Sequence, residues 1–370
     1  MPKTRLQQLA DLGQSTWLDY LSRDILHDGK LAQMMERDAV VGVTSNPTIF
    51  QKALAAGNAY DEQLKELLEH EDDAKEIFLA LSAGDIKEGC ALLRRAWDAS
   101  DHTDGYVSWE VDPELADDRD ATFEEAKRLH EWIDEPNLYV KIPATSAGVG
   151  AIEDSIAAGR NINVTLIFSL ERYKEVVEAY LRGLERLVAG GGDPSDVQSV
   201  ASFFVSRVDT EADKRLEKIG SEEALALRGK LAIANAKLAY QHYKEVFSGE
   251  AWEALEAKGA SKQRCLWAST STKNPDYRDV IYVEELIGAN TVNTMPEETI
   301  VAFQDHGVVA ETLENGLDEA RDVLEKLAQV GVDYDDVTAT VEKEGVQKFI
   351  DSFDELKAGI AEKRAALAAA

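Results

Sequence analysis

Eight short runs rich in β-branched and aromatic residues alternate with longer amphipathic stretches along this chain of 370 residues. The runs are STWLDY (15–20), AVVGVT (39–44), GYVSWEV (105–111), NLYVKI (137–142), INVTLIF (162–168), VASFFV (200–205), RCLWAS (264–269) and ANTVNT (289–294). A strand followed each time by a helix is the pattern of parallel α/β proteins. Eight such units predict a single (β/α)8 TIM barrel, with an open doubly wound sheet as the alternative.

The length beyond eight compact units lies in helical stretches. Insertions at about 48–104 and 210–259 follow the second and sixth runs, and a C-terminal helix is expected at about 335–366. The clearest helical period extends from Ser221 to Phe247, with Ser221 as its N-cap. Because no repeat or linker-like composition divides the chain, we interpret 1–370 as one domain. The C-terminal helix could cap the barrel, contact another subunit or present a solvated acidic face, and we expect the last.

The charge balance excludes several classes of partner. Acidic residues number 70 against 40 basic ones, which gives a formal net charge of -30. Such a surface repels nucleic acid and anionic lipid. Cys90 and Cys265 are far apart in sequence, which argues against a disulfide framework and fits a reducing compartment. We find no apolar core of a signal peptide and no apolar run long enough for a membrane span, so we expect a cytoplasmic protein.

Polar residues interrupt the expected strands at alternate positions. A strand buried on both faces should be apolar throughout, and its side chains alternate between the two faces. Five runs place polar or large aromatic residues together on one face: Trp17 with Asp19, Ser108 with Glu110, Tyr139 with Lys141, Asn163 with Thr165, and Ser202 with Phe204. If the smooth apolar faces pack under the helices, these side chains converge inside the barrel. Most of them fall near strand C-terminal ends, where barrel enzymes place their chemistry.

Lys141 is the centre of this candidate site. A lysine near the end of an apolar strand loses hydration, which disfavours its ammonium form. The neutral amine could attack a carbonyl and form a Schiff base. The alternative is a lysine that extends its charged end to solvent from a strand end. Asp19 and Glu110 could move protons next to the amine, or they could be a helix cap and an ion-pair partner.

Metal and cofactor chemistry is not indicated by the sequence. None of the six histidines shows paired ligand spacing. There is also no GxGxxG after a strand and no GxxxxGK[ST] motif for phosphate binding. We therefore predict that no metal and no organic cofactor takes part.

Five ordered blocks resemble the transaldolase family. They are VTSNPTIF (43–50), NLYVKIPAT (137–145), INVTLIFS (162–169), ASFFVSRVD (201–209) and ASTSTKNP (268–275). Each block lies at or near an expected strand, and the resemblance extends from the first strand to ANTVNTMPEET (289–299). The family consists of class I aldolases built on a barrel, with a Schiff-base lysine on the fourth strand.

The resemblance implies a catalytic role for each of four residues. Lys141, within YVKIPAT, corresponds to the Schiff-base lysine. Asp19 resembles the acid/base that acts on the C4 hydroxyl of the donor during carbon–carbon cleavage. Glu110 resembles the acid/base that works through a water molecule, and Thr165 the residue that holds that water.

The resemblance also implies a set of binding residues. Asn46 and Asn163 correspond to residues that bind donor hydroxyls and the enamine, and Phe204 to an active-site aromatic residue. Ser202 and Arg207 correspond to phosphate contacts, although Arg207 could instead form an ion pair with Asp209 or with a neighbouring helix.

One phosphate contact departs from the family pattern. The commoner sequence has a second phosphate-binding arginine after the seventh strand, whereas Lys273 occupies that role here. An ammonium lacks the planar fork of a guanidinium, so bidentate phosphate recognition is not expected from it. The alternative is a solvated loop lysine.

The implied activity is that of a transaldolase of the pentose phosphate pathway. The donors would be sedoheptulose 7-phosphate or fructose 6-phosphate, and the acceptors glyceraldehyde 3-phosphate or erythrose 4-phosphate. The expected partners are these sugar phosphates alone, with neither nucleic acid nor membrane, and the protein would be a monomer or homodimer. Two alternatives are a fructose 6-phosphate aldolase that releases free dihydroxyacetone and a non-catalytic barrel that binds phosphosugars.

Overall fold

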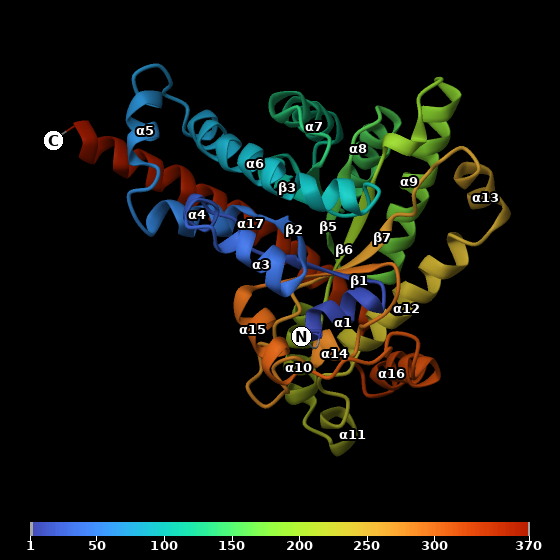
Figure 1. The fold of residues 1–370 in the computed structure, drawn as a ribbon. Coiled ribbons are helices and arrows are strands. Elements are labelled where there is room, and N and C mark those ends of the chain that lie inside the picture. Colours follow the sequence, from blue (N-terminus) through green and yellow to red (C-terminus); the bar gives the residue numbers. More distant parts are fainter. Residues whose placement is uncertain (1–2, 369–370) are drawn as a thin grey trace.

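A computed structural model describes residues 3–368, and these form a closed barrel of eight parallel strands in chain order (Figure 1). The strands are β1 (Gln14–Leu18), β2 (Val40–Thr44), β3 (Tyr106–Glu110), β4 (Leu138–Pro143), β5 (Ile162–Ile167), β6 (Ser199–Phe204), β7 (Arg264–Ala268) and β8 (Thr291–Met295). Every expected strand overlaps one of these. The parallel pairing of β1 with β8 closes the barrel, which confirms the TIM barrel and excludes the open sheet.

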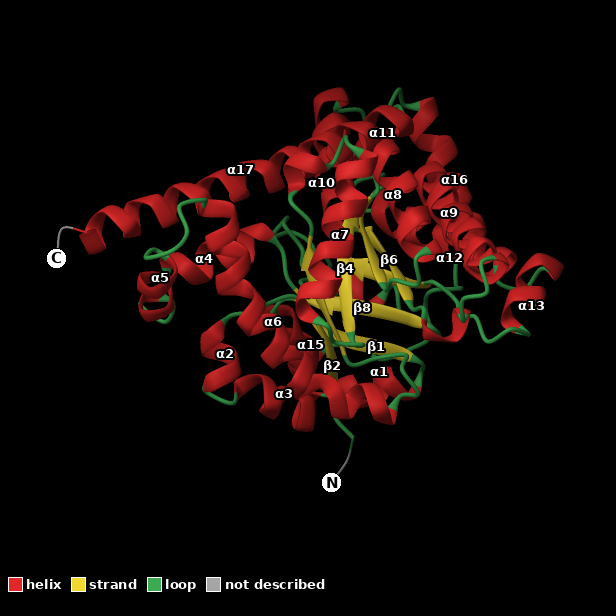
Figure 2. Ribbon diagram, turned by 90° about the horizontal axis from the view of Figure 1, so that it is seen from above, coloured by secondary structure: helices red, strands yellow, loops and turns green. Residues whose placement is uncertain are grey.

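Helices surround the strands (Figure 2). Before β3 they are α1 (Arg5–Asp11), α2 (Arg23–His27), α3 (Lys30–Asp38), α4 (Pro47–Ala55), α5 (Asp61–Leu67) and α6 (Ala74–Ala99). Between β3 and β7 they are α7 (Arg119–Ile133), α8 (Ser146–Ala157), α9 (Leu170–Ala189), α10 (Ser206–Ile219), α11 (Glu222–Leu225), α12 (Leu231–Val246) and α13 (Glu250–Glu256). After β7 they are α14 (Ile281–Glu284), α15 (Glu297–His306), α16 (Leu317–Gln329) and α17 (Tyr334–Ala368).

The prediction of one continuous helix from Ser221 to Phe247 is wrong, because the structure has two helices there. Ser221 does cap a helix by accepting the N–H of Ala224 at 3.1 Å, but α11 ends within one turn and α12 begins only at Leu231. Gly229 lies in this break with φ +69°, and its N–H donates to Asp213 Oδ1 at 2.9 Å. A glycine in the left-handed region, held by a carboxylate from another helix, therefore overrides the local helical periodicity.

The barrel interior is filled with side chains at its N-terminal end. The indole of Trp17 lies across Gly42, where a Cβ atom would come within 2.5 Å of the ring. Tyr106 and Tyr139 stack beside it, with ring centroids 4.0 Å apart. These rings fill the lower layers of the barrel interior, so a ligand that reaches the inside of the barrel must enter from the opposite end.

The C-terminal helix has the exposed acidic face that we expected, with Asp335, Asp351 and Glu355 all exposed, but it also has a buried apolar face. It starts at Tyr334, whose hydroxyl donates to Asn235 Oδ1 at 2.7 Å, and Phe349 and Phe353 are both buried farther along it. Its Ser352 bonds to Thr48 of α4 at 2.7 Å. In Figure 1 the helix extends from the barrel to the region beside α4 and α6. The helix therefore covers part of the barrel mouth, and its apolar face is buried there.

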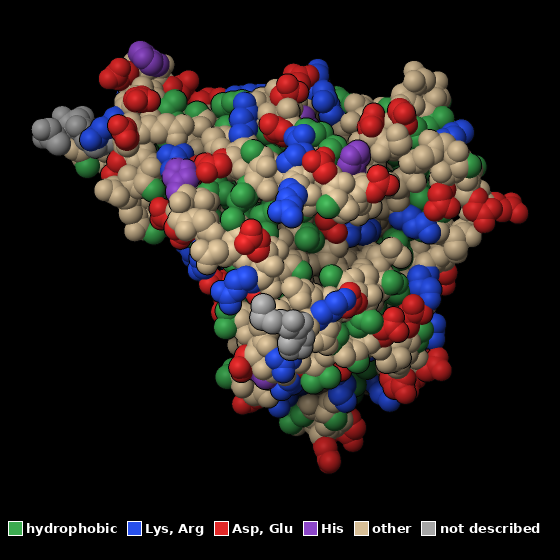
Figure 3. All heavy atoms as spheres, in the orientation of Figure 1, with side chains coloured by type: hydrophobic (Ala, Val, Ile, Leu, Met, Phe, Trp, Pro, Cys, Tyr) green, Lys and Arg blue, Asp and Glu red, His purple; other side chains and the backbone are tan. Residues whose placement is uncertain are grey.

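The surface carries charges of both signs. Figure 3 shows acidic side chains spread over one face, with lysines and arginines between them. Within residues 3–368, no helix combines the length and the apolar character needed to cross a bilayer.

Candidate active site

A cavity of about 270 Å³ opens at the carboxyl ends of the strands, bounded on one side by α4 and α17. Eight of the ten candidate residues line it, and the other two, Glu110 and Asn163, contact residues that do. The eight are Asp19, Asn46, Lys141, Thr165, Ser202, Phe204, Arg207 and Lys273. The strand ends thus bring residues from across the sequence to one place.

Lys141 and Glu110 form a buried ion pair at the floor of the cavity. They are register partners on the adjacent strands β4 and β3, and Lys141 Nζ lies 3.2 Å from Glu110 Oε2. The side chains are only 6% and 4% exposed, and Lys141 also donates to the Ser45 carbonyl at 3.0 Å. Burial raises the pKa of the Glu110 carboxyl, although the nearby ammonium opposes this. Glu110 is therefore suited to accept a proton from Lys141.

Asp19 lies at the end of β1 and faces the same cavity. The Thr44 hydroxyl donates a hydrogen bond to Asp19 Oδ1 at 2.8 Å. The hydroxyl oxygens of Thr44 and Thr294 are also within hydrogen-bond distance, at 2.6 Å. Burial raises the pKa of Asp19, while the charges of Lys141 and other cations lower it. Two carboxyl groups with raised pKa values thus flank one lysine, an arrangement that favours acid/base chemistry.

A chain of hydrogen bonds connects β3, β5 and β6 below the cavity. Asn163 Nδ2 donates to Ser108 Oγ at 3.0 Å, and Ser202 Oγ donates to Asn163 Oδ1 at 2.7 Å. Asn163 is fully buried, so in this arrangement it contacts protein groups and fixes Ser202. The neighbouring Thr165 Oγ1 is buried and has no hydrogen-bond partner in the described part of the chain. Leu166, next in β5, has φ +58°, where the pairing with β6 is irregular.

Asn46 has a structural contact as well as a place in the cavity wall. Its Oδ1 accepts the N–H of Ile49 at 3.0 Å and caps α4, with Pro47 at the first helical position. The cap fixes the orientation of the side chain, and its Nδ2 can still donate to a ligand.

Arg207 and Lys273 give the cavity a local positive charge. The Arg207 guanidinium lies 5.2 Å from the centroid of the Phe204 ring, which in turn packs on Phe168. Lys273 Nζ donates to Ser271 Oγ at 2.8 Å. Within residues 3–368, neither cation forms an ion pair with a carboxylate. In particular, Asp209 does not pair with Arg207, because it accepts hydrogen bonds from Ala232 N–H and the Tyr282 hydroxyl.

Sequence reasoning missed several lining residues. Lys52 of α4 and Lys348 and Phe349 of α17 face the cavity, together with Thr44 and Glu298. The Phe349 ring lies 5.9 Å from Lys141 Nζ. Lys52 lies one helical turn after Thr48 in the VTSNPTIF block, so its position could have been inferred. Nothing in the sequence of the C-terminal helix indicated that Lys348 faces the site.

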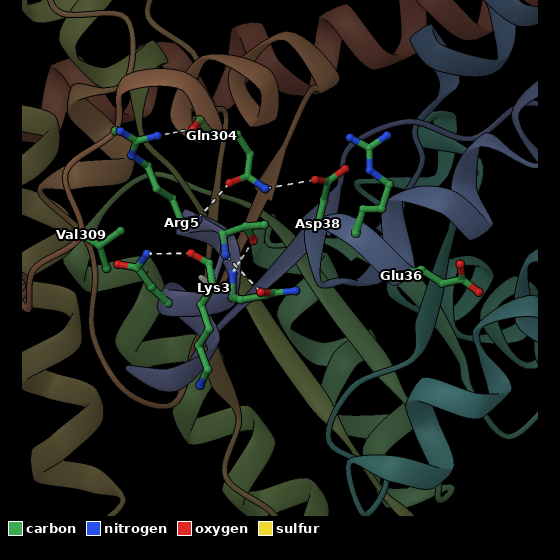
Figure 4. A pocket seen from close by; sticks show the side chains of 11 residues that line it. Lys3, Arg5, Glu36, Asp38, Gln304 and Val309 are labelled. Carbon is green, nitrogen blue, oxygen red and sulfur yellow. Dashed lines mark hydrogen bonds between the residues drawn. The ribbon is translucent and has the colours of Figure 1, made fainter. Parts of the chain in front are cut away.

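A second hollow lies between α1, α3 and α15 and is lined by none of the candidate site residues (Figure 4). Gln304 Oε1 accepts the N–H of Arg5 at 3.0 Å, and Gln304 Nε2 donates to Asp38 at 3.0 Å. These contacts attach the N-terminal helix to the barrel, so we interpret the hollow as structural. Across the described residues, no three His, Cys, Asp or Glu side chains come together as a possible metal site.

Comparisons with known proteins agree with this geometry. Residues 16–360 match the family described as Transaldolase/Fructose-6-phosphate aldolase. The chain is 53% identical over 359 residues to a transaldolase of Frankia alni, covering 97% of both chains. It is also 53% identical over 353 residues to a transaldolase of Mycolicibacterium paratuberculosis, covering 95% of both. A transaldolase of Thermobifida fusca is 51% identical over 362 residues, covering 98% of both.

Proposed function

The chain belongs to the Transaldolase/Fructose-6-phosphate aldolase family, and we propose that it transfers a dihydroxyacetone unit between sugar phosphates through a Schiff base at Lys141. The observation that carries this assignment is the buried Lys141–Glu110 pair, 3.2 Å apart, in a cavity that Asp19 also lines. Donors are sedoheptulose 7-phosphate or fructose 6-phosphate, and acceptors are glyceraldehyde 3-phosphate or erythrose 4-phosphate.

The reaction begins with imine formation. Lys141 transfers a proton to Glu110, and the neutral amine attacks the C2 carbonyl of the donor ketose. Glu110, through a water molecule held by Thr165, then protonates the carbinolamine hydroxyl, which leaves as water. The unpartnered hydroxyl of Thr165 supports this role, since a buried hydroxyl ordinarily finds a partner. The product is an iminium that links Lys141 to C2.

Asp19 then governs cleavage and transfer. Its carboxylate takes the proton of the C4 hydroxyl, the C3–C4 bond breaks, and the electron pair moves to the iminium nitrogen to give an enamine. An aldose phosphate leaves. The enamine carbon attacks the aldehyde of the acceptor, Asp19 returns the proton to the new hydroxyl, and water releases the product from Lys141. Because the protein amine is the electron sink, the sequence of steps requires neither a metal nor an organic cofactor.

The remaining candidate residues orient the sugar phosphate. Arg207 and Lys273 bind the phosphate as charge-assisted donors, together with the hydroxyl of Ser202. Asn46 donates to a donor hydroxyl from the start of α4. Phe204 holds the Arg207 guanidinium over its ring, and Asn163 acts by fixing Ser202.

The transferase assignment is preferred over a free aldolase. The relatives that match along nearly the whole chain are transaldolases, and they share its length. A free aldolase would release dihydroxyacetone without an acceptor, and a non-catalytic barrel would form no covalent adduct. We further propose that the protein acts in the cytoplasm as a monomer or homodimer, and its net charge of -30 disfavours binding to nucleic acid or to anionic membranes.

Borohydride trapping tests the covalent step. Incubation with fructose 6-phosphate and borohydride should leave a three-carbon adduct on Lys141, found by peptide mass spectrometry. Lys237 is an internal control, because its side chain is also withdrawn from solvent at 9% exposure but pairs with Glu285 outside the cavity. An adduct on Lys237, or on no lysine, contradicts the assignment. Release of dihydroxyacetone at the same rate with and without acceptor contradicts the transferase reaction.

A further inference from the structure

Five cationic side chains and two carboxylates line the cavity. The cations are Lys52, Lys141, Arg207, Lys273 and Lys348, and the carboxylates are Asp19 and Glu298. Lys141 already has Glu110 as its partner. Within residues 3–368, none of the other four cations forms an ion pair with a carboxylate. Four cations without a direct ion-pair partner therefore line one cavity, against two carboxylates, in a chain whose net charge is -30.

Two of these cations come from helices that are fixed against each other. Thr48 of α4 and Ser352 of α17 bond through their hydroxyls at 2.7 Å. Lys52 lies one turn after Thr48, and Lys348 lies one turn before Ser352, so each lysine shares a helix face with a residue of this contact. The hydrogen bond thus holds both lysine-bearing turns at the mouth.

The approach of α17 to Arg207 is also close. At Gly345 a Cβ atom would lie 3.4 Å from Arg207 Nη1 and 3.2 Å from Leu166, so the glycine lets the helix pass near the guanidinium. The pKa of Lys348 is lowered by burial and further by the charges of Arg207, Lys273 and Lys52. Like charges around one cavity repel one another, and an anion bound between them would offset this repulsion.

We propose that Lys348, together with Lys52, binds the phosphate of the sugar substrates and sets the preference for phosphorylated acceptors. The inference rests on the proposed function, since it assigns these lysines to the same reaction. A phosphate dianion accepts hydrogen bonds on several oxygens, and lysines bind it as point charges from several directions. Three lysines around Arg207 therefore supply the charge that a second arginine supplies in the commoner family pattern. The C-terminal helix is then part of the substrate site as well as a cover over it.

The test compares two acceptors at a saturating concentration of fructose 6-phosphate. In a ping-pong reaction, kcat/KM for the acceptor reports only the second half-reaction. For Lys348→Met, the ratio of kcat/KM for glyceraldehyde 3-phosphate to that for unphosphorylated glyceraldehyde should fall about tenfold, the effect of one lost charge-assisted contact. Lys348→Arg should restore most of it. The matched control is Lys343→Met on the same helix, because Lys343 is exposed and does not line the cavity, and its ratio should equal that of the parent protein.

Two further measurements separate this inference from the proposed function. Calorimetric titration with inorganic phosphate needs no turnover, and Lys348→Met should weaken phosphate binding about tenfold. If the parent protein proves inactive while this loss is found, the proposed function fails and the phosphate site stands. The Lys52→Met, Lys348→Met double variant should lose more of the acceptor ratio than either single variant. An unchanged ratio, whether neither kcat/KM value falls or both fall by the same factor, overturns the inference.

Discussion

The two ends of the barrel differ in how their polar side chains are paired. At the N-terminal end, Arg264 pairs with Asp104 at 3.0 Å, and Asp104 also accepts hydrogen bonds from Ser15 at 2.7 Å and from the Trp17 indole at 3.0 Å. At the mouth, by contrast, Arg207 and the three neighbouring lysines have no carboxylate partner among the described residues. Both ends hold a buried ion pair, since Lys141 pairs with Glu110 at the mouth, but only the mouth also gathers several cations that have no ion-pair partner among the described residues.

This difference indicates separate tasks for the two ends. A satisfied polar network in a closed, aromatic-filled layer stabilises one arrangement of the strands. Buried carboxyl groups with raised pKa values and the positive φ of Leu166 and Ser269 are costly to folding, and the rest of the barrel must offset that cost. We therefore expect substitutions at the mouth to change activity more than stability, and substitutions at the N-terminal end to do the reverse.

The largest effect is expected at the mouth, from Lys141→Met. Without the amine no imine forms, so kcat should fall by at least about 10⁴-fold, as for the loss of a covalent nucleophile. The protein should remain folded, because the raised pKa of Glu110 lets this carboxyl group take a proton once its partner is gone. A coupled assay for aldose phosphate and a thermal melt measure the two quantities. Near-normal kcat would remove Lys141 from the mechanism.

For Arg264→Met, at the N-terminal end of the barrel, we expect a loss of stability with little change in kcat. Breaking a largely buried ion pair leaves Asp104 without its cation, at a cost of about 3 kcal/mol in the free energy of unfolding. Because the pair lies at the far end of the barrel, kcat should stay within about threefold of the parent value. Urea unfolding and steady-state kinetics test this. Arg321→Met is the control, since its exposed pair with Asp318 should contribute less than about 1 kcal/mol.

Features that depend on local sequence could be predicted, whereas features that depend on contacts between distant residues could not. β-Branched runs with a two-residue alternation are local signals, so the sequence alone predicts all eight strands and the inward faces of Lys141, Glu110 and Thr165. The break before α12 could not, because it depends on a hydrogen bond from Gly229 to Asp213 on another helix.

The contribution of the C-terminal helix was also hidden in the sequence. An amphipathic period shows that a helix has an apolar face, but not which surface that face covers. Lys348 reaches the cavity because α17 packs on α4, which lies about three hundred residues earlier in the chain. Catalytic residues on strands could therefore be predicted from local alternation, whereas charges supplied by a covering helix required the tertiary structure.

A pH-dependent effect is expected from Asp209, which lies on α10 two residues after Arg207 and is hydrogen-bonded within the protein. Burial raises the pKa of its carboxyl to about 7, and it accepts hydrogen bonds from Ala232 N–H and the Tyr282 hydroxyl. A carboxyl with a raised pKa in the folded state contributes stability that is present at low pH. That stability is lost as pH rises from about 4, the ordinary pKa, through about 7.

Asp209→Asn tests this, because the amide keeps one acceptor for Ala232 and cannot ionise. The free energy of unfolding of the parent, relative to the variant, should therefore fall between pH 4.5 and pH 8, measured by urea unfolding at each pH. Taking the difference between the two proteins removes the shared titration of Asp19 and Glu110. A difference that is independent of pH would mean that Asp209 is ionised throughout this range. The hydrogen bonds from Ala232 and Tyr282 would then be enough to stabilise a buried, charged Asp209 carboxylate near the mouth.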